Sequence, residues 1–247
     1  ELCRFIADRG GKVSISSLRI DALDDDLLDI LHAGGHKTVA LAPEGGSQRL
    51  RDLIRKGIDE DQILRACDIL IGRDILNLKL YFIIGLPTET MDDLEEMVEL
   101  VAKIRERVIA AARKNRRLGS ILLSVNPFIP KPFTPFQWCG MEAMPSLEKK
   151  YAYLRRAVGK LSNVKIQTES LRESYLQALL SRGDRRLAAL LVASGKAGGI
   201  KRAARELAID TDYLVSRTIP LHEILPWDLI DSGERERLVE EYEKAFG

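Results

Sequence analysis

Residues 38–47 read TVALAPEGGS, and residues 80–90 read LYFIIGLPTET. Each stretch is a short apolar run that stops at Gly or Pro and passes into a polar helix start, which is the pattern of a βα unit. The loops that follow parallel strands carry the ligand sites of α/β proteins. We therefore expect function at these two strand ends, the first of which holds Glu44 and Ser47.

The alternation of strand and helix continues on both sides of these stretches. We expect strands over 13–21, 39–41, 77–84 and 120–125, and helices over 24–31, 48–56, 60–70 and 90–114. Ser47 caps the second of these helices, Asp59 with Gln62 approximates a capping box for the third, and Thr90 with Asp93 opens the fourth. Short loops between such units demand right-handed crossovers and a parallel sheet. Four strands are too few to close an eight-stranded barrel, so the sheet is open or its other strands precede residue 1.

The composition changes after the fourth expected strand. Residues 126–138, NPFIPKPFTPFQW, contain four prolines and four aromatic side chains. Neither a helix nor a central strand accepts proline at this density. Beyond residue 145 the pattern is helical, with one short strand expected over 164–167. We therefore divide the chain into an α/β part over 1–145 and a mainly helical part over 146–247.

Composition also narrows the functional classes. The 247 residues include 38 basic and 37 acidic ones, and the net charge of +1 gives no support for bulk nucleic-acid binding. No run of eighteen apolar residues and no signal-peptide pattern occurs, so a cytoplasmic protein without a membrane partner is expected. Cys3, Cys67 and Cys139 lack CxxC or CxxxC spacing. We assign no metal ligand and no catalytic residue from them.

The first strand end has the chemistry of an anion site. Gly45-Gly46-Ser47 before a helix offers free backbone N–H groups and the positive end of a helix dipole to a carboxylate or phosphate. Glu44 can accept hydrogen bonds from hydroxyl or ammonium groups, and Lys56 adds a cation if the intervening helix packs across the strand end. Taken alone, Gly-Gly-Ser is equally well explained as a turn with an N-cap.

Three segments, in this order, resemble the radical S-adenosylmethionine (SAM) enzymes. Residues 42–57 are similar to the fourth-strand segment of that family, and residues 83–94 to its fifth-strand segment. Residues 124–138 resemble the sixth-strand segment of the branch that also carries a cobalamin-binding domain. The resemblance covers roughly residues 13–138 and implies part of a TIM-like barrel of parallel strands.

The resemblance also implies roles for individual residues. Glu44 would contact the ribose of SAM, and Ser47 and Lys56 would hold its methionine carboxylate. The residues that would flank the adenine are Ile84, Gly85, Pro87 and Asn126. Arg19 and Asp21, on the strand expected over 13–21, would point toward SAM or substrate.

One departure from the family is large. The CxxxCxxC loop that ligates the family's 4Fe–4S cluster is absent from the sequence, as is the glycine-rich second-strand segment. The resemblance therefore implies a C-terminal fragment that is inactive by itself. The full-length enzyme would use the cluster to cleave SAM and start radical chemistry on an unknown substrate, with cobalamin as a further candidate cofactor.

Three further interpretations stay open at this point. A sheet edge left uncovered at the strand expected over 13–20 would favour self-association or pairing with another chain. The chain is alternatively a redox-independent α/β domain that binds a nucleotide or an anion. A partner-binding module would instead place function in the helical part.

Overall fold

The computed structural model describes residues 2–11, 13, 18–23, 25–115, 117–230 and 233–246. Contacts divide the chain into two compact units that interleave along the sequence. The first unit comprises Glu1–Ile84, Thr88–Asn126 and Lys149–Thr168, and the second comprises Gly85–Pro87, Pro127–Glu148 and Glu169–Gly247. The division of the chain near residue 145 stays a prediction, because compactness is no test of independent folding.

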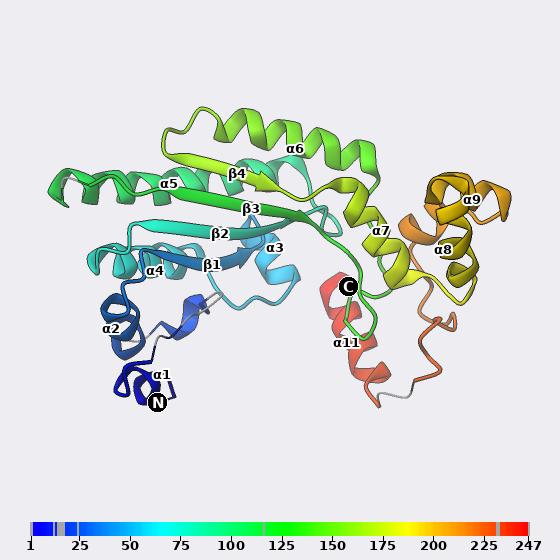
Figure 1. Cartoon of the computed structure of the whole chain (residues 1–247), viewed down its shortest axis with the longest axis horizontal. Helices are drawn as coiled ribbons and strands as arrows, with labels where there is room; N and C mark the ends of the chain where they lie inside the picture. The colour runs from blue at the N-terminus through cyan, green and yellow to red at the C-terminus, as the bar shows by residue number, and fades with distance from the viewer. Residues whose placement is uncertain are drawn as a thin grey trace. The chain divides into compact units, whose positions relative to one another are not determined.

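A parallel sheet forms the centre of the first unit. Within the described residues, four strands lie in the order β1 (Thr38–Glu44), β2 (Asn77–Ile84), β3 (Ile121–Pro127) and β4 (Val164–Thr168). β1 pairs in parallel with β2, and β3 with β4. The Leu78 N–H donates to the Ser120 carbonyl at 2.9 Å, which joins β2 to β3. The sheet is open, so the expected fold class, a partial barrel of parallel strands with helices, is confirmed (Figure 1).

Helices connect these strands. The first unit contains α1 (Leu2–Ala7), α2 (Asp25–Ala33), α3 (Gln48–Leu53), α4 (Glu60–Gly72), α5 (Met91–Asn115) and most of α6 (Met144–Val158). The predicted capping box opens α4, because the Asp59 carboxylate accepts from the Gln62 N–H and the Gln62 side chain accepts from the Asp59 N–H. Ion pairs from Lys103 to Glu60 and from Arg107 to Asp68 fasten α5 along α4.

The core of this unit follows the periodicity of its strands and helices, which is two residues in a strand and 3.6 residues in a helix. Every second residue of β2 is buried, and α5 buries residues three or four positions apart. These residues are Leu78, Leu80, Phe82 and Ile84 on β2, and Met97, Val101, Ile104 and Val108 on α5. A buried ion pair of 2.7 Å between Lys150 and Glu89 adds a polar fastening between α6 and the segment after β2.

The strand expected over 13–21 is corrected. Residues 14–17 lie outside the described residues, as does Asp24, the expected cap of the following helix. Leu18 makes one parallel bridge to Leu41, but Ile20–Ala22 form a short 3₁₀ helix, η1. The strand is wrong there because the chain turns into η1, which packs against α4 and β1.

Two further boundaries differ from the sequence prediction. α3 ends at Leu53 instead of continuing to Lys56, because Arg55 and Gly57 adopt positive φ angles of 51° and 68° that no helix tolerates. The strand expected over 164–167 exists as β4, but it extends the parallel sheet instead of standing in the helical part. The intervening α6 supplies the crossover that a parallel partner of β3 requires.

The second unit is mainly helical. Its helices after β4 are α7 (Leu171–Arg182), α8 (Arg186–Ala197), α9 (Ile200–Glu206), α10 (Thr211–Ser216) and α11 (Arg235–Phe246). The sequence pattern did not indicate α10, which has six residues and is capped by Asp210. In the described part of the chain, no helix is both long enough and apolar enough to cross a bilayer.

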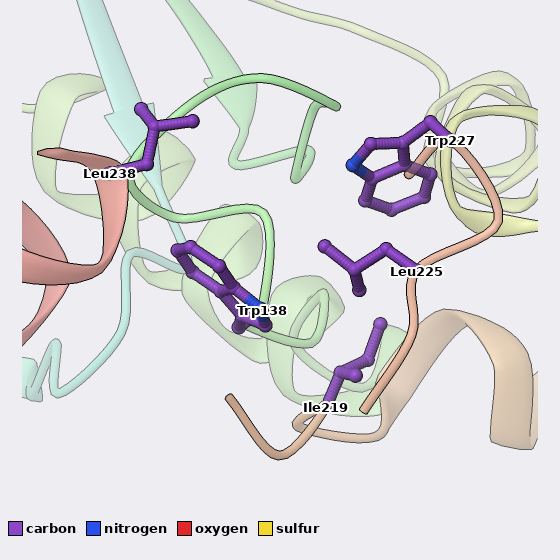
Figure 2. Packing of buried hydrophobic residues seen from close by; sticks show 5 residues of the cluster. All are labelled: Trp138, Ile219, Leu225, Trp227 and Leu238. Atoms are coloured by element: carbon purple, nitrogen blue, oxygen red, sulfur yellow. The ribbon is translucent and has the colours of Figure 1, made fainter. Parts of the chain in front are cut away.

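Two tryptophans anchor the core of the second unit. Trp138, Ile219, Leu225, Trp227 and Leu238 form its buried cluster (Figure 2). The Trp227 indole N–H donates to the Gln137 side-chain oxygen at 2.7 Å, so this tryptophan is held as a packing residue with its polar group satisfied. Trp138 stacks edge-on against Tyr242 of α11.

The Gly-Gly turn after β1 gives a test of the fold. A Cβ at Gly46 would lie 2.7 Å from the Asp93 carbonyl oxygen and 2.7 Å from Met97 Cβ. Gly46→Ala should therefore lower the free energy of unfolding by about 1–3 kcal/mol through overpacking. Gly72→Ala, where a Cβ meets nothing within 4 Å, is the control and should be neutral or stabilising by up to about 1 kcal/mol. Urea unfolding of both variants measures the difference, and equal effects would contradict the close approach of α5.

Candidate functional site

Glu44, the last residue of β1, has a strained backbone. Its φ is 64°, and the Gly45 N–H donates to the Pro43 carbonyl at 2.8 Å, which closes a three-residue turn around it. The pairing of β1 with β2 also shifts register between Leu41 and Glu44. A non-glycine residue in this region costs of order 1–3 kcal/mol, and such strain clusters at binding sites and active sites. The observation marks Glu44 as a candidate functional residue.

Lys56 lies beside Glu44. Its Nζ is 3.5 Å from Glu44 Oε1, and the two side chains are 33% and 27% exposed respectively. The turn after α3 returns the chain to the strand end, and the Lys56 N–H donates to the Arg51 carbonyl at 2.8 Å. The structure thus brings together the acid and the base that the sequence placed twelve residues apart.

Arg19 and Asp21 form a second charged pair near Lys56. Arg19 Nη2 donates to Asp21 Oδ2 at 2.6 Å, and its Nε donates to Oδ1 at 3.1 Å. The Arg19 hydrogen bond lowers the pKa of Asp21, and the charge of Lys56 contributes to the same shift. Two acidic and two basic side chains therefore gather at this end of β1. Asp21 lies in η1 and Arg19 directly precedes it, so neither residue is part of a strand.

Ser47 is fully buried and its hydroxyl is occupied. Its Oγ accepts from the Leu50 N–H at 3.2 Å as the N-cap of α3, and it donates to Asp93 Oδ1 at 2.6 Å. A hydrogen bond from Ser47 to a ligand carboxylate would have to replace the bond to Asp93, since a hydroxyl has one proton to donate. The expected ligand contact of Ser47 therefore stays a prediction that requires a local rearrangement.

Asp93 joins the two strand ends that the sequence singled out. Besides Ser47 after β1, its carboxylate accepts from the Thr90 N–H at 2.7 Å and from Arg49 Nη2 at 2.5 Å. Arg49 also donates to the Thr88 carbonyl at 2.9 Å. Burial alone would raise the pKa of Asp93, but the hydrogen bonds from Ser47, Thr90 and Arg49 outweigh it and hold this pKa below its ordinary value.

Arg51 is a site residue that sequence reasoning missed. Its side chain is buried, and Nη1 donates to the carbonyls of Gly45 and Gly46 at 3.2 and 3.1 Å. Burial lowers the pKa of this guanidinium. Arg51 therefore stabilises the Gly-Gly turn by binding its carbonyl groups. The sequence did not indicate this role, because an arginine on an amphipathic helix is ordinarily expected to face solvent.

The other expected site residues divide between the two units. In the first unit, Ile84 is buried at the end of β2 and Asn126 is half-buried one residue before the end of β3. Glu44, Ile84 and Asn126 thus lie at or next to the ends of three neighbouring strands. Gly85 and Pro87 belong to the second unit, where a Cβ at Gly85 would lie 2.8 Å from a Leu147 methyl group.

Comparison with known proteins finds a family match in the first part of the chain. Residues 2–101 match the radical SAM superfamily. This match covers less than half of the 247 residues. An uncharacterized protein of Methanocaldococcus jannaschii is 39% identical over 191 residues, which make up 77% of this chain and 39% of that protein. The chain thus spans well under half of the length of the relative that it matches, and membership of the cobalamin-binding branch stays a prediction.

The radical SAM family implies a 4Fe–4S cluster, and the cysteines of this chain do not fit one. Cys3 lies on α1, Cys67 is buried in α4, and Cys139 belongs to the second unit. Burial raises the pKa of Cys67 and that of Cys139 to about 12, which disfavours the thiolate form that ligates iron. The described residues contain no group of three or more His, Cys, Asp or Glu side chains arranged to hold a metal ion.

The buried carboxylate gives a test by stability. Asp93→Asn removes the charge that Arg49, Ser47 and Thr90 satisfy, and should lower the free energy of unfolding at neutral pH by about 2 kcal/mol. Because the native pKa of Asp93 is depressed, its stabilisation is present above the pKa of an unfolded Asp, about 3.9, and is lost as the pH falls through the native value. The variant should lack this acid-dependent part.

Denaturant unfolding between neutral and acid pH measures the effect, with Asp92→Asn as the control. Asp92 is the exposed neighbour of Asp93 on the same helix turn, and its substitution changes the net charge identically. Equal pH profiles for the two variants would contradict the role assigned to Asp93.

Proposed function

We propose that this chain is the SAM-binding part of a radical SAM enzyme, in which Glu44 and Lys56 make the principal contacts to SAM. The observation that carries the proposal is the half-exposed Glu44–Lys56 pair at the end of β1. It is held by a strained turn within the segment that matches the radical SAM superfamily. Strand ends of this kind are where α/β folds bind ligands.

The charges at this strand end complement the amino-acid portion and the ribose of SAM. SAM carries a carboxylate, an ammonium group and two ribose hydroxyls. The Lys56 ammonium is suited to the carboxylate, and the Glu44 carboxylate accepts from hydroxyl groups. Their mutual distance of 3.5 Å is longer than a strong charge-assisted hydrogen bond, so both groups can turn to a ligand at little cost. Arg19 and Asp21 extend the polar surface toward SAM or substrate.

The remaining contacts belong to the same proposal. Ile84 and Asn126, with the backbone of Gly85 and Pro87, would flank the adenine, and Ser47 would assist at the carboxylate after releasing Asp93. The apolar Ile84 and the amide of Asn126 suit a planar base that needs one apolar face and one hydrogen-bonding partner.

The redox chemistry of the full-length protein belongs to a cofactor that this chain does not ligate. When bound, a 4Fe–4S cluster supplies the electron that cleaves SAM, and we infer that its ligands come from a segment outside these 247 residues. The match to a longer relative supports this inference. The role of this chain is to bind and orient SAM, with cobalamin as a candidate second cofactor, and the chain by itself should be inactive.

The SAM contacts are tested by substitution in the cluster-reconstituted full-length protein. Glu44→Ala and Lys56→Ala should each weaken SAM binding roughly ten- to hundredfold, because each removes a charge-assisted hydrogen bond of about 1.5–3 kcal/mol. Lys37→Ala is the control, since Lys37 is an exposed cation next to the opposite end of β1.

Calorimetric titration with SAM measures these affinities. Unchanged affinity in both site variants would sink the assignment of Glu44 and Lys56. Binding of AMP that is lost in Glu44→Ala, without any binding of SAM, would instead support a redox-independent nucleotide-binding domain.

The cluster assignment has its own test. The 247-residue chain, given iron and sulfide under anaerobic conditions, should retain no stoichiometric 4Fe–4S cluster, because its cysteines lack both spacing and thiolate character. Iron analysis and visible absorbance measure the result. Four irons per chain would show that its own cysteines ligate a cluster.

A further inference from the structure

A large cavity lies within the second unit. Its volume is about 1160 Å³, and its wall is formed by the segment leading into α6, the first turns of α7, the turn between α8 and α9, and α10. Small-molecule sites in proteins usually enclose about 300–1,000 Å³ and combine apolar walls with a few polar groups. The cavity is therefore large enough for a ligand of nucleotide size.

Basic side chains from two separate elements line this cavity. Arg172 comes from α7, whereas Lys201, Arg202 and Arg205 come from α9. Arg202 pairs with Glu206 of its own helix at 3.2 Å, and Arg205 Nε donates to the Lys201 carbonyl at 3.3 Å. Within the described part of the chain, Arg172, Lys201 and Arg205 make no ion pair with a carboxylate.

The carboxylates of the wall already have structural roles. Asp212 Oδ1 accepts from the Tyr175 hydroxyl at 2.6 Å, and Glu142 accepts from the Ser146 hydroxyl. Glu173 lies in the first turn of α7, where a negative charge is stabilised by the helix dipole. These carboxylates stay charged, so the wall carries four cations against three carboxylates, and the cations without a carboxylate partner in the described residues are Arg172, Lys201 and Arg205.

The rest of the wall is apolar or bare backbone. Met141 and Val215 are buried, and Leu176 and Ile200 are half-buried. At Gly198 and Gly199, with φ angles of 76° and 143°, an added Cβ would meet nothing within 4 Å. These residues leave room for an uncharged body beside the cations.

We propose that this cavity binds a small phosphate ester with a planar or apolar body, of the size of a nucleoside monophosphate. Arg172, Lys201 and Arg205 hold the phosphate, whose charge near −2 at neutral pH suits three cations better than a single carboxylate does. The guanidinium groups add a planar array of donors that matches phosphate oxygens. The apolar wall contacts the body of the ligand. This site is separate from the SAM contacts proposed for Glu44 and Lys56.

Calorimetric titration of the chain with AMP, adenosine and inorganic phosphate tests the proposal. AMP should bind, and adenosine and inorganic phosphate should each bind at least tenfold more weakly, because one lacks the charge and the other lacks the body. The double variant Arg172→Gln with Lys201→Gln should bind AMP at least tenfold more weakly than the unsubstituted chain.

Lys196→Gln and Glu44→Ala are the matched controls. Lys196 is an exposed cation of α8 outside the cavity, so its substitution should leave AMP affinity unchanged. Glu44→Ala should also leave it unchanged, whereas a loss there would assign AMP to the end of β1 and overturn the proposal. Lys201→Arg keeps the charge and should retain binding.

Besides a loss of AMP affinity in Glu44→Ala, four results would overturn the proposal. They are no AMP binding at millimolar concentration, equal affinity for AMP and adenosine, unchanged affinity in the folded double variant, and an equal loss in Lys196→Gln. Thermal unfolding checks that the double variant is folded. If the double variant is unfolded, the comparison of AMP with adenosine on the unsubstituted chain tests whether the phosphate contributes to binding.

Discussion

The carboxylate of Asp93 is the group on which the strand-end region depends. It lies on the first turn of α5, yet it accepts hydrogen bonds from Ser47 after β1, from Thr90 after β2 and from Arg49 on α3. A buried charge is stable only when all of its acceptor capacity is met, so each donor is needed by the others. Asp93, which lies on neither strand, therefore ties the segment after Glu44 to the segment after β2.

Local chemistry explains what the sequence predicted correctly. The capping box of α4 needs only Asp59 and Gln62 three residues apart, and the apolar run of β2 needs only its own side chains. The strand expected over 13–21 failed at Ile20–Ala22, because the alternating pattern of buried and exposed residues does not reveal that the chain turns there to pack η1 against α4. The sheet membership of β4 depends on pairing with β3 across α6, and no local pattern encodes that register.

In the candidate site, too, the contacts between residues distant in sequence were not predictable from local patterns. Lys56 was expected near Glu44 only if the intervening helix packed across the strand end, and the two side chains do lie 3.5 Å apart. The sequence does not decide the role of Ser47, since serine is suited both to an N-cap and to a ligand contact. Its bond to Asp93, 46 residues away, and the inward turn of Arg51 arise from packing alone.

The left-handed backbone of Glu44 implies a conflict between stability and function. At a φ of 64°, glycine would relieve the strain of a Cβ, and asparagine is the side-chain residue that best tolerates this conformation. Selection for stability alone would thus favour replacing Glu44, even though glutamate is the residue that gives this strand end its carboxylate. A sequence-design procedure that optimises the free energy of folding of this chain would be expected to replace Glu44, and a stabilised version of the protein should be designed with position 44 held fixed.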